Sequence, residues 1–376
     1  MHYRRFGKTN LELSVFSLGT MRYLGSERLA KQTIEAAIAA GINHIETAPS
    51  YGQSEIYLGQ ALRELNIPRS QIYLTTKVLP TSDANTLQQG IEDSLRRLQT
   101  DYVDCLAIHG INTGEHLDWI TQSQGCLQVL QAAIEQRKIH HLGFSTHGSL
   151  ELILAALGTQ LFEFVNLHYY YFFQRHEPAI AWAAQQDIGV LIISPVDKGG
   201  QLYAPSSLLT ELCQPLSPLA FNYRFLLSDP RITTLSLGAA HPEELNAALA
   251  MAERTEPLSP QESAIAARLE QHQKQVLGTD RCAQCYQCLP CPEAIHIPEV
   301  LRLRNLAVAY EMTAFSQYRY RMFENAGHWF PGRRGDRCTD CGECLPRCPE
   351  HLDIPRLLRD AHERLKGPSR RRLWES

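Results

Sequence analysis

The stretch Gly41-Ile42-Asn43-His44-Ile45-Glu46-Thr47-Ala48-Pro49-Ser50-Tyr51-Gly52 leads from a helix into a strand and then into a polar loop. Gly41 ends a helical pattern over residues 28–40. Ile42 to Glu46 is a short, mostly apolar run of the kind that forms a buried strand. A second helical pattern follows at residues 53–65. This stretch therefore predicts a strand with a helix on either side of it in sequence.

The same alternation continues along the chain. Strands are predicted at 15–19, 42–46, 72–77, 103–108, 141–144, 163–167, 189–193 and 234–237, and helices at 28–40, 53–65, 84–98, 126–138, 149–157, 175–186 and 242–253. Eight strands alternating with helices predict an α/β fold, a (β/α)8 TIM barrel over residues 1–276. A hairpin at 3–5 and 11–13 would close its bottom. A doubly wound sheet is the alternative, but no G-x-G-x-x-G follows an early strand.

Two cysteine runs lie beyond the predicted barrel. They are Cys282-x-x-Cys285-x-x-Cys288-x-x-Cys291-Pro and Cys338-x-x-Cys341-x-x-Cys344-x-x-x-Cys348-Pro. The second has the spacing of a bacterial ferredoxin motif, in which the fourth cysteine of each run ligates the other cluster. We therefore expect two [4Fe-4S] clusters. The first would use Cys282, Cys285, Cys288 and Cys348, and the second Cys338, Cys341, Cys344 and Cys291.

Cysteines at these spacings have two other uses, zinc ligation and disulfide bonds. Zinc also takes paired C-x-x-C motifs, but two C-x-x-C-x-x-C runs that each end in Cys-Pro fit zinc poorly. Disulfides are disfavoured in the reducing cytoplasm, where we expect this protein.

The cysteine runs also belong to an internal repeat. The segment 291–302, which begins Cys-Pro-Glu and continues with Ile-Pro, matches 348–359. The residues between the runs carry a helical pattern. Residues 277–376 are therefore predicted to form an all-α ferredoxin-like domain that resembles the α-helical ferredoxin type.

Length and charge limit the classes of partner. A chain of 376 residues suits two domains, and a formal net charge of −4 indicates no nucleic-acid partner. No apolar run approaches the length of a membrane span. We expect a small-molecule substrate and a ferredoxin or other electron-transfer protein as partner. The run Arg370-Arg371-Arg372 would attract an acidic donor, although a solvated terminus is the usual role of such a run.

Titratable residues follow the predicted strands two, three and four. Glu46 ends the second strand and Tyr51 follows it, Lys77 ends the third, and His109 follows the fourth. The carboxyl ends of barrel strands meet at one rim, where active sites of this fold lie. Singly these residues suit packing roles, but four titratable groups at one rim indicate chemistry.

Here the chain resembles the aldo/keto reductase family over roughly residues 1–255. Residues 41–52 are similar to that family's signature, and Thr76-Lys77 and Ile108-His109 stand where its other catalytic residues belong. The resemblance implies a tetrad of Glu46, Tyr51, Lys77 and His109. Tyr51 would donate a proton to the substrate oxygen, and Lys77 would lower the phenol pKa. Glu46 would hold Lys77, and His109 would orient the substrate.

The resemblance also implies a dinucleotide, NADP or NAD. Its carboxamide would meet Ser145 and Thr146, with Asn166 at a position usually held by glutamine. The loop after strand seven would lie near the pyrophosphate, and the loop after strand eight near the adenosine half. The candidate residues are Ser194, Lys198, Gly199 and Gly200 in the first loop, and Gly238 and His241 in the second.

Several family positions are altered. The tetrad carboxylate is normally aspartate, and Glu46 is one methylene longer. His241, largely neutral at pH 7, is the single candidate cation in a loop that usually grips the 2′-phosphate of NADP, and Glu244 would repel that phosphate. Ala247 and Ala248 replace the Glu-Asn pair for adenine, and Ile193 replaces an aromatic residue.

Three functions are compatible with these features. The first is reduction of a carbonyl or similar apolar or aromatic substrate with NAD(P)H, with the clusters in electron-transfer or structural roles. The second is a ferredoxin-driven reductase whose clusters feed electrons to a substrate in the barrel. The third is an electron-transfer or redox-sensing protein with a vestigial barrel. A flavin would link two-electron and one-electron steps, but no motif here indicates one.

Overall fold

The computed structural model describes residues 1–23 and 25–367. The run Arg370–Arg372 lies outside the described residues. The chain divides into two compact units. The first contains Met1–Gly199 and Leu219–Leu258, and the second contains Gly200–Pro218 and the residues from Ser259 onward. The predicted boundary at residues 276 and 277 stays a prediction.

The first unit is the closed barrel that the alternation predicts. Its eight parallel strands follow the order β10-β3-β4-β5-β6-β7-β8-β9, so each strand pairs with its neighbours in sequence and β10 closes on β3. The strands are β3 (Phe16–Gly19), β4 (His44–Glu46), β5 (Tyr73–Val78), β6 (Val103–His109), β7 (Ile139–Ser145), β8 (Phe164–Leu167), β9 (Gly189–Ile192) and β10 (Thr234–Leu237).

A hairpin precedes the barrel strands, as predicted. Strand β1 (Tyr3–Arg5) pairs antiparallel with β2 (Glu12–Ser14). Its turn brings Phe6 against Gly189 at the start of β9, where a Cβ would lie 2.4 Å from the phenylalanine ring. The hairpin therefore packs at the amino ends of the strands, away from the rim where their carboxyl ends meet.

The barrel interior contains a buried polar layer. His44 on β4 contacts Ser17 Oγ through Nδ1 at 2.6 Å and Thr75 Oγ1 through Nε2 at 2.7 Å. Ser17 Oγ lies 2.7 Å from Thr234 Oγ1. These residues are buried, so the hydrogen bonds satisfy polar groups that would otherwise destabilise the barrel.

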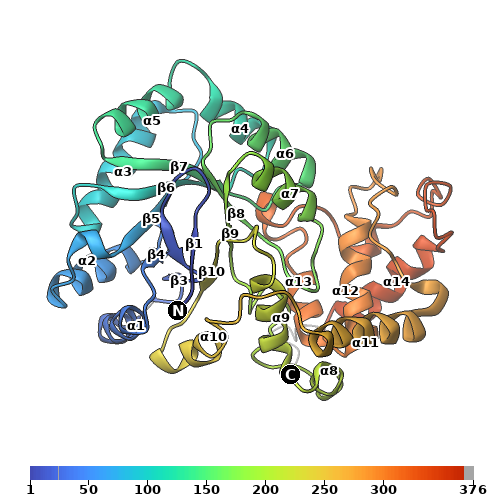
Figure 1. The fold of residues 1–376 in the computed structure, drawn as a ribbon. Helices are drawn as coiled ribbons and strands as arrows, with labels where there is room; N and C mark the ends of the chain where they lie inside the picture. The colour runs from blue at the N-terminus through green and yellow to red at the C-terminus, as the bar shows by residue number, and fades with distance from the viewer. Residues whose placement is uncertain (24, 368–376) are drawn as a thin grey trace, which may run out of the picture. The chain divides into compact units, whose positions relative to one another are not determined.

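Helices cover the outside of the strands in the first unit (Figure 1). Caps set several of their starts: Ser26 caps α1 (Glu27–Ala39), Asp83 caps α3 (Ala84–Leu98), and Ser149 caps α6 (Leu150–Gly158). The other helices of this unit are α2 (Ser54–Glu64), α4 (Gly114–Thr121), α5 (Cys126–Glu135), α7 (Glu177–Gln185), α9 (Pro218–Leu227) and α10 (Asn246–Leu249).

The second unit has the helical architecture predicted from the repeat. Each half of the repeat begins a helix at its Ile-Pro pair, α12 (Ile297–Tyr310) and α14 (Ile354–Leu365). Proline is favoured in the first turn because its missing N–H has no acceptor there. Helices α8 (Ser207–Cys213), α11 (Pro260–Leu277) and α13 (Thr313–Tyr320) complete the unit. Across residues 1–23 and 25–367, no helix is both long enough and apolar enough to cross a membrane.

Two glycines in neighbouring barrel helices give a test of this packing. At Gly59 in α2, a Cβ would lie 2.7 Å from the Leu98 carbonyl, whereas at Gly90 in α3 the nearest atom is Val78 Cγ1 at 3.6 Å. Alanine in a helix interior is otherwise worth about 0.5–1 kcal/mol over glycine. We expect Gly90→Ala to keep or raise the thermal unfolding midpoint and Gly59→Ala to lower it. Equal shifts in the two variants would contradict the close approach of α2 to the end of α3.

Candidate active site

Three adjacent strands bring the predicted tetrad together. Glu46 ends β4, Lys77 lies one residue before the end of β5, and His109 ends β6. Tyr51 comes from the loop between β4 and α2. Because β4, β5 and β6 are parallel neighbours, their carboxyl ends meet at the same rim of the barrel.

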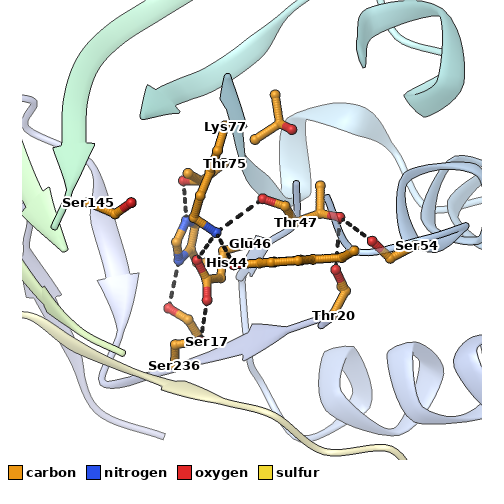
Figure 2. Close-up of polar contacts among 12 residues, drawn as sticks. Ser17, Thr20, His44, Glu46, Thr47, Ser54, Thr75, Lys77, Ser145 and Ser236 are labelled. Carbon is orange, nitrogen blue, oxygen red and sulfur yellow. Dashed lines mark hydrogen bonds and ion pairs between the residues drawn. The ribbon is translucent and has the colours of Figure 1, made fainter. Parts of the chain in front are cut away.

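Lys77 occupies the centre of this group (Figure 2). Its ammonium donates to Glu46 Oε2 at 2.6 Å, to Tyr51 Oη at 3.1 Å and to the Thr47 carbonyl at 3.2 Å. Glu46 is 5% exposed and Lys77 is 1% exposed. The three ammonium protons therefore each have an acceptor in a site that water scarcely reaches.

Burial and pairing act in opposite directions on this ion pair. Burial disfavours the charged form of each group, but each partner stabilises the charge of the other. Lys77, together with a hydrogen bond from Ser236, outweighs the effect of burial and lowers the pKa of Glu46 below its ordinary value. Burial lowers the pKa of Lys77, but the charge of Glu46 and the hydrogen bonds to Glu46 and Tyr51 more than compensate, so that pKa is raised. Both groups are thus ionised at neutral pH.

The phenol of Tyr51 differs from the sequence-based expectation. Burial raises its pKa, and the negative charge of Glu46 adds to this effect. Lys77 acts in the predicted, lowering direction but does not outweigh burial. The expectation of a lowered phenol pKa is therefore wrong, and Tyr51 is fully protonated at neutral pH.

His109 stands beside Tyr51 as a neutral base. The two rings meet edge to face, with centroids 5.7 Å apart and planes at 89°. Burial lowers the pKa of His109 to about 3, and the positive charges of Lys77 and Lys198 contribute. A neutral imidazole has one donor and one acceptor nitrogen, so it is able to donate a hydrogen bond to a substrate oxygen.

The residues predicted to meet a carboxamide lie on the next strand ends. In the strand register His109 pairs with Ser145 on β7, and Ser145 pairs with Asn166 on β8. Asn166 is fully buried, and neither atom of its amide has a hydrogen-bond partner in the part of the chain that the structure describes. Thr146 instead donates to the Ile111 carbonyl at 2.6 Å. An unsatisfied buried amide matches the donor and acceptor of a ligand carboxamide, which fits a nicotinamide.

The loop after β9, which was expected near the pyrophosphate, makes a tight turn. Lys198 N donates to the Ser194 carbonyl at 3.1 Å, and Ser194 has a φ of 52°. A Cβ at Gly199 would lie 2.0 Å from the Pro195 carbonyl oxygen, so only glycine fits there. Gly200 belongs to the second compact unit.

The loop after β10 contains an ion pair that the sequence did not reveal. Arg22, from the loop after β3, donates to the Gly238 carbonyl at 2.9 Å and pairs with Glu244. The Glu244 carboxylate also accepts from Ala240 N at 3.1 Å. His241 precedes the short helix η2 (Pro242–Leu245) and makes no capping hydrogen bond with its side chain. The cation at this loop is therefore Arg22, which is more than two hundred residues away in sequence.

The eight motif cysteines gather in the second unit. Cys291, Cys338, Cys341 and Cys344, the four predicted ligands of one cluster, line one small hollow. Burial raises the pKa of Cys282 to about 11, and the nearby Cys285 and Cys348 add to it. Within residues 1–23 and 25–367, no three His, Cys, Asp or Glu side chains converge on the point of a single metal ion. The fit to clusters thus rests on the shared hollow and on the proximity of cysteines from opposite runs.

Removing Lys77 tests the ion pair. In Lys77→Met a buried Glu46 loses its cation, which costs about 3–5 kcal/mol when the carboxylate is charged. Burial alone then raises the Glu46 pKa above its unfolded value, so the variant loses stability as pH rises through that pKa. We expect its thermal midpoint to fall further below the wild-type value at pH 8 than at pH 5. The double variant Lys77→Met/Glu46→Gln should lose this pH dependence, and an equal deficit at both pH values would contradict the pairing.

Comparison with known proteins gives several relatives of the barrel. Aldo-keto reductase YhdN from Bacillus subtilis is 36% identical over 126 residues, which cover 29% of this chain and 38% of that protein. Methylglyoxal reductase DkgB from Salmonella typhi is 30% identical over 151 residues, covering 39% and 54%. L-galactose dehydrogenase from Arabidopsis thaliana is 34% identical over 155 residues, covering 38% and 47%. The chain thus spans about half or less of these relatives.

Solved structures share the barrel. The aldo-keto reductase AKR11C1 from Bacillus halodurans superimposes with a TM-score of 0.63 at 22% identity, covering 71% of this chain and 96% of that one. A putative aldo-keto reductase from Pseudomona aeruginosa gives a TM-score of 0.56 at 24% identity, covering 67% and 94%. At such identities the likeness establishes the fold alone.

Two family models match the sequence. Residues 281–352 match the 4Fe-4S dicluster domain. Residues 16–205, about half of the chain, match the aldo/keto reductase family. The chain therefore belongs to the aldo/keto reductase family and carries a 4Fe-4S dicluster domain after its barrel.

Proposed function

We propose that this protein is an oxidoreductase that reduces a carbonyl group to an alcohol with NADPH or NADH at the rim of its barrel. The observation that carries this proposal is the buried Lys77 ammonium, which contacts both Glu46 Oε2 at 2.6 Å and Tyr51 Oη at 3.1 Å. A phenol that must give up a proton in a buried site needs an adjacent cation, and Lys77 supplies it.

A reduced dinucleotide, when bound, would supply a hydride to the carbonyl carbon. Tyr51 Oη gives its proton to the carbonyl oxygen, so the product is a neutral alcohol. Its raised pKa keeps the proton on Tyr51 until the substrate oxygen becomes basic. Lys77 then stabilises the phenolate across 3.1 Å, and Glu46 holds Lys77 in place.

Two further groups orient the reactants. His109 is neutral and donates a hydrogen bond to the carbonyl oxygen, which polarises the carbonyl. Asn166 would hold the nicotinamide carboxamide with its unpaired amide, beside Ser145. Two relatives are named for reduction of methylglyoxal and dehydrogenation of L-galactose. We propose a small carbonyl compound as the substrate here.

We further propose that the eight motif cysteines hold two [4Fe-4S] clusters with exchanged fourth ligands. Cys282, Cys285, Cys288 and Cys348 would hold one, and Cys338, Cys341, Cys344 and Cys291 the other. The hollow lined by Cys291 together with three cysteines of the second run supports the exchange. Such clusters transfer electrons singly.

A second function is favoured by the loop after β10. The Arg22–Glu244 pair and the Ala240–Glu244 hydrogen bond occupy groups that a 2′-phosphate would need. A low-potential donor such as reduced ferredoxin would then deliver two electrons through the clusters, and two protons would complete the same alcohol. A protein that only carries or senses electrons is the remaining alternative.

Tyr51→Phe separates these functions. If NAD(P)H drives the reaction, the variant should lose at least about a hundredfold in kcat, because the proton donor is gone, while the cluster absorbance is unchanged. The measurement is anaerobic turnover with NADPH, NADH or reduced ferredoxin, over a panel of small carbonyl compounds. Turnover with ferredoxin alone, lost in Cys341→Ser, would replace the first proposal by the second. No turnover with any donor would leave the electron-carrier function.

Serine variants of single cysteines test the exchanged ligation. Cys348→Ser and Cys288→Ser should alter the same electron paramagnetic resonance signal of the reduced protein, because both remove a ligand of one cluster. Cys291→Ser and Cys341→Ser should alter the other signal. If Cys348→Ser instead affects the signal that Cys341→Ser affects, each run binds its own cluster and the exchange is wrong.

A further inference from the structure

The Glu46 carboxylate uses both of its oxygens. Oε2 accepts from Lys77, and Oε1 accepts from Ser236 Oγ at 2.6 Å (Figure 2). Ser236 lies on β10, two residues before Gly238. A hydrogen bond from a hydroxyl to a buried carboxylate is among the stronger kinds in proteins. Ser236 thus holds the end of the Glu46 side chain that faces away from Lys77.

Gly19 at the end of β3 leaves the space for this contact. Gly19 pairs with Glu46 in the strand register. A Cβ at position 19 would lie 2.6 Å from Ser236 Oγ and 3.2 Å from Glu46 Oε1. Its φ is not in the left-handed region, so glycine is required by space and not by backbone conformation.

The other polar side chain of β4 does not supply a hydrogen bond to Glu46 in place of Ser236. His44, two residues before Glu46 and on the same face of the strand, has both ring nitrogens engaged by Ser17 and Thr75. Burial lowers the pKa of His44 to about 4, so it is neutral near pH 7. The polar groups below Glu46 therefore form hydrogen bonds with one another, and none of them provides a cation for the Glu46 carboxylate.

We propose that Ser236 and Gly19 are positioning residues that seat the longer carboxylate Glu46, and so hold the Lys77 ammonium against Tyr51. This inference rests on the proposed reduction at Tyr51. Without the Ser236 hydrogen bond and the space at Gly19, the extra methylene of glutamate would move its carboxylate away from the position that an aspartate gives. Lys77 would move with it. If Ser236 and Gly19 had only a structural role, their substitution would change stability but would not shift the acidic limb of the kcat–pH profile.

A rescue experiment tests the space at Gly19. We expect Gly19→Ala to lower kcat about tenfold or more, because its methyl group displaces Ser236 and Glu46. Adding Glu46→Asp shortens the displaced side chain, so Gly19→Ala/Glu46→Asp should turn over faster than Gly19→Ala alone. A double variant that is slower than both single variants would overturn the proposal.

Ser236→Ala tests the hydrogen bond, with Ser17→Ala as the matched control. Both serines are buried in the barrel and pair across β10 and β3, but Ser17 contacts His44 and Thr234 instead of Glu46. Loss of the Ser236 donor raises the pKa of Glu46, because that bond favours the carboxylate. We expect the acidic limb of the kcat–pH profile to move to higher pH in Ser236→Ala and to stay in place in Ser17→Ala. Identical profiles in the two variants would overturn the proposal.

Thermal unfolding keeps this test separate from the proposed function. The midpoints of Gly19→Ala, Glu46→Asp and the double variant form a cycle that needs no turnover. If the losses in thermal midpoint are not additive, Glu46 contacts the space at Gly19, and this result holds even if no substrate is reduced. In that case the proposed reduction fails, but the positioning of Glu46 by Ser236 and Gly19 remains. Additive losses in thermal midpoint would overturn the positioning role of Gly19, whatever the measured activity.

Discussion

The buried ion pair between Lys77 and Glu46 is the interaction on which the rest of the site depends. Two opposite charges are out of water at the rim of the barrel, and each is kept ionised by the other. Such a pair is stable only if its remaining hydrogen bonds are made. Thr47 and Tyr51 accept the remaining hydrogen bonds of the Lys77 ammonium, and Ser236 donates a hydrogen bond to the second oxygen of the Glu46 carboxylate. The position of the Tyr51 phenol is therefore a consequence of the pair.

The two halves of the proposed dinucleotide site differ in chemistry. Asn166 presents an unsatisfied buried amide where a nicotinamide would be held. At the loop after β10, by contrast, Glu244 already satisfies Arg22 and Ala240 N. A phosphate there would have to displace a carboxylate of the same charge. Under the proposed function, a dinucleotide held weakly at this loop would make the proposed clusters a relevant source of electrons.

Much of the fold was predictable because it depends on local patterns. The eight strands, the hairpin at β1 and β2, and the two Ile-Pro helix starts lie where periodicity and repeats indicated. Helices α4, α8, α9 and α11 were not predicted, although the capping box of Ser259 and Glu262 was readable for α11. The tetrad positions followed from strand ends. The pKa of Tyr51 did not, because burial depends on residues distant in sequence.

By itself, the sequence determined the barrel and the two cysteine runs, and it placed Glu46, Tyr51, Lys77 and His109 at or just after strand ends, since spacing and alternation are properties of neighbouring residues. The tertiary structure alone decided which distant groups meet. It joined Arg22 to Glu244 and Ser236 to Glu46, and it made Gly19 the space into which a longer carboxylate fits. The physical reason is closure: β10 returns beside β3, so residues 190 and 222 positions apart in sequence come within hydrogen-bond distance.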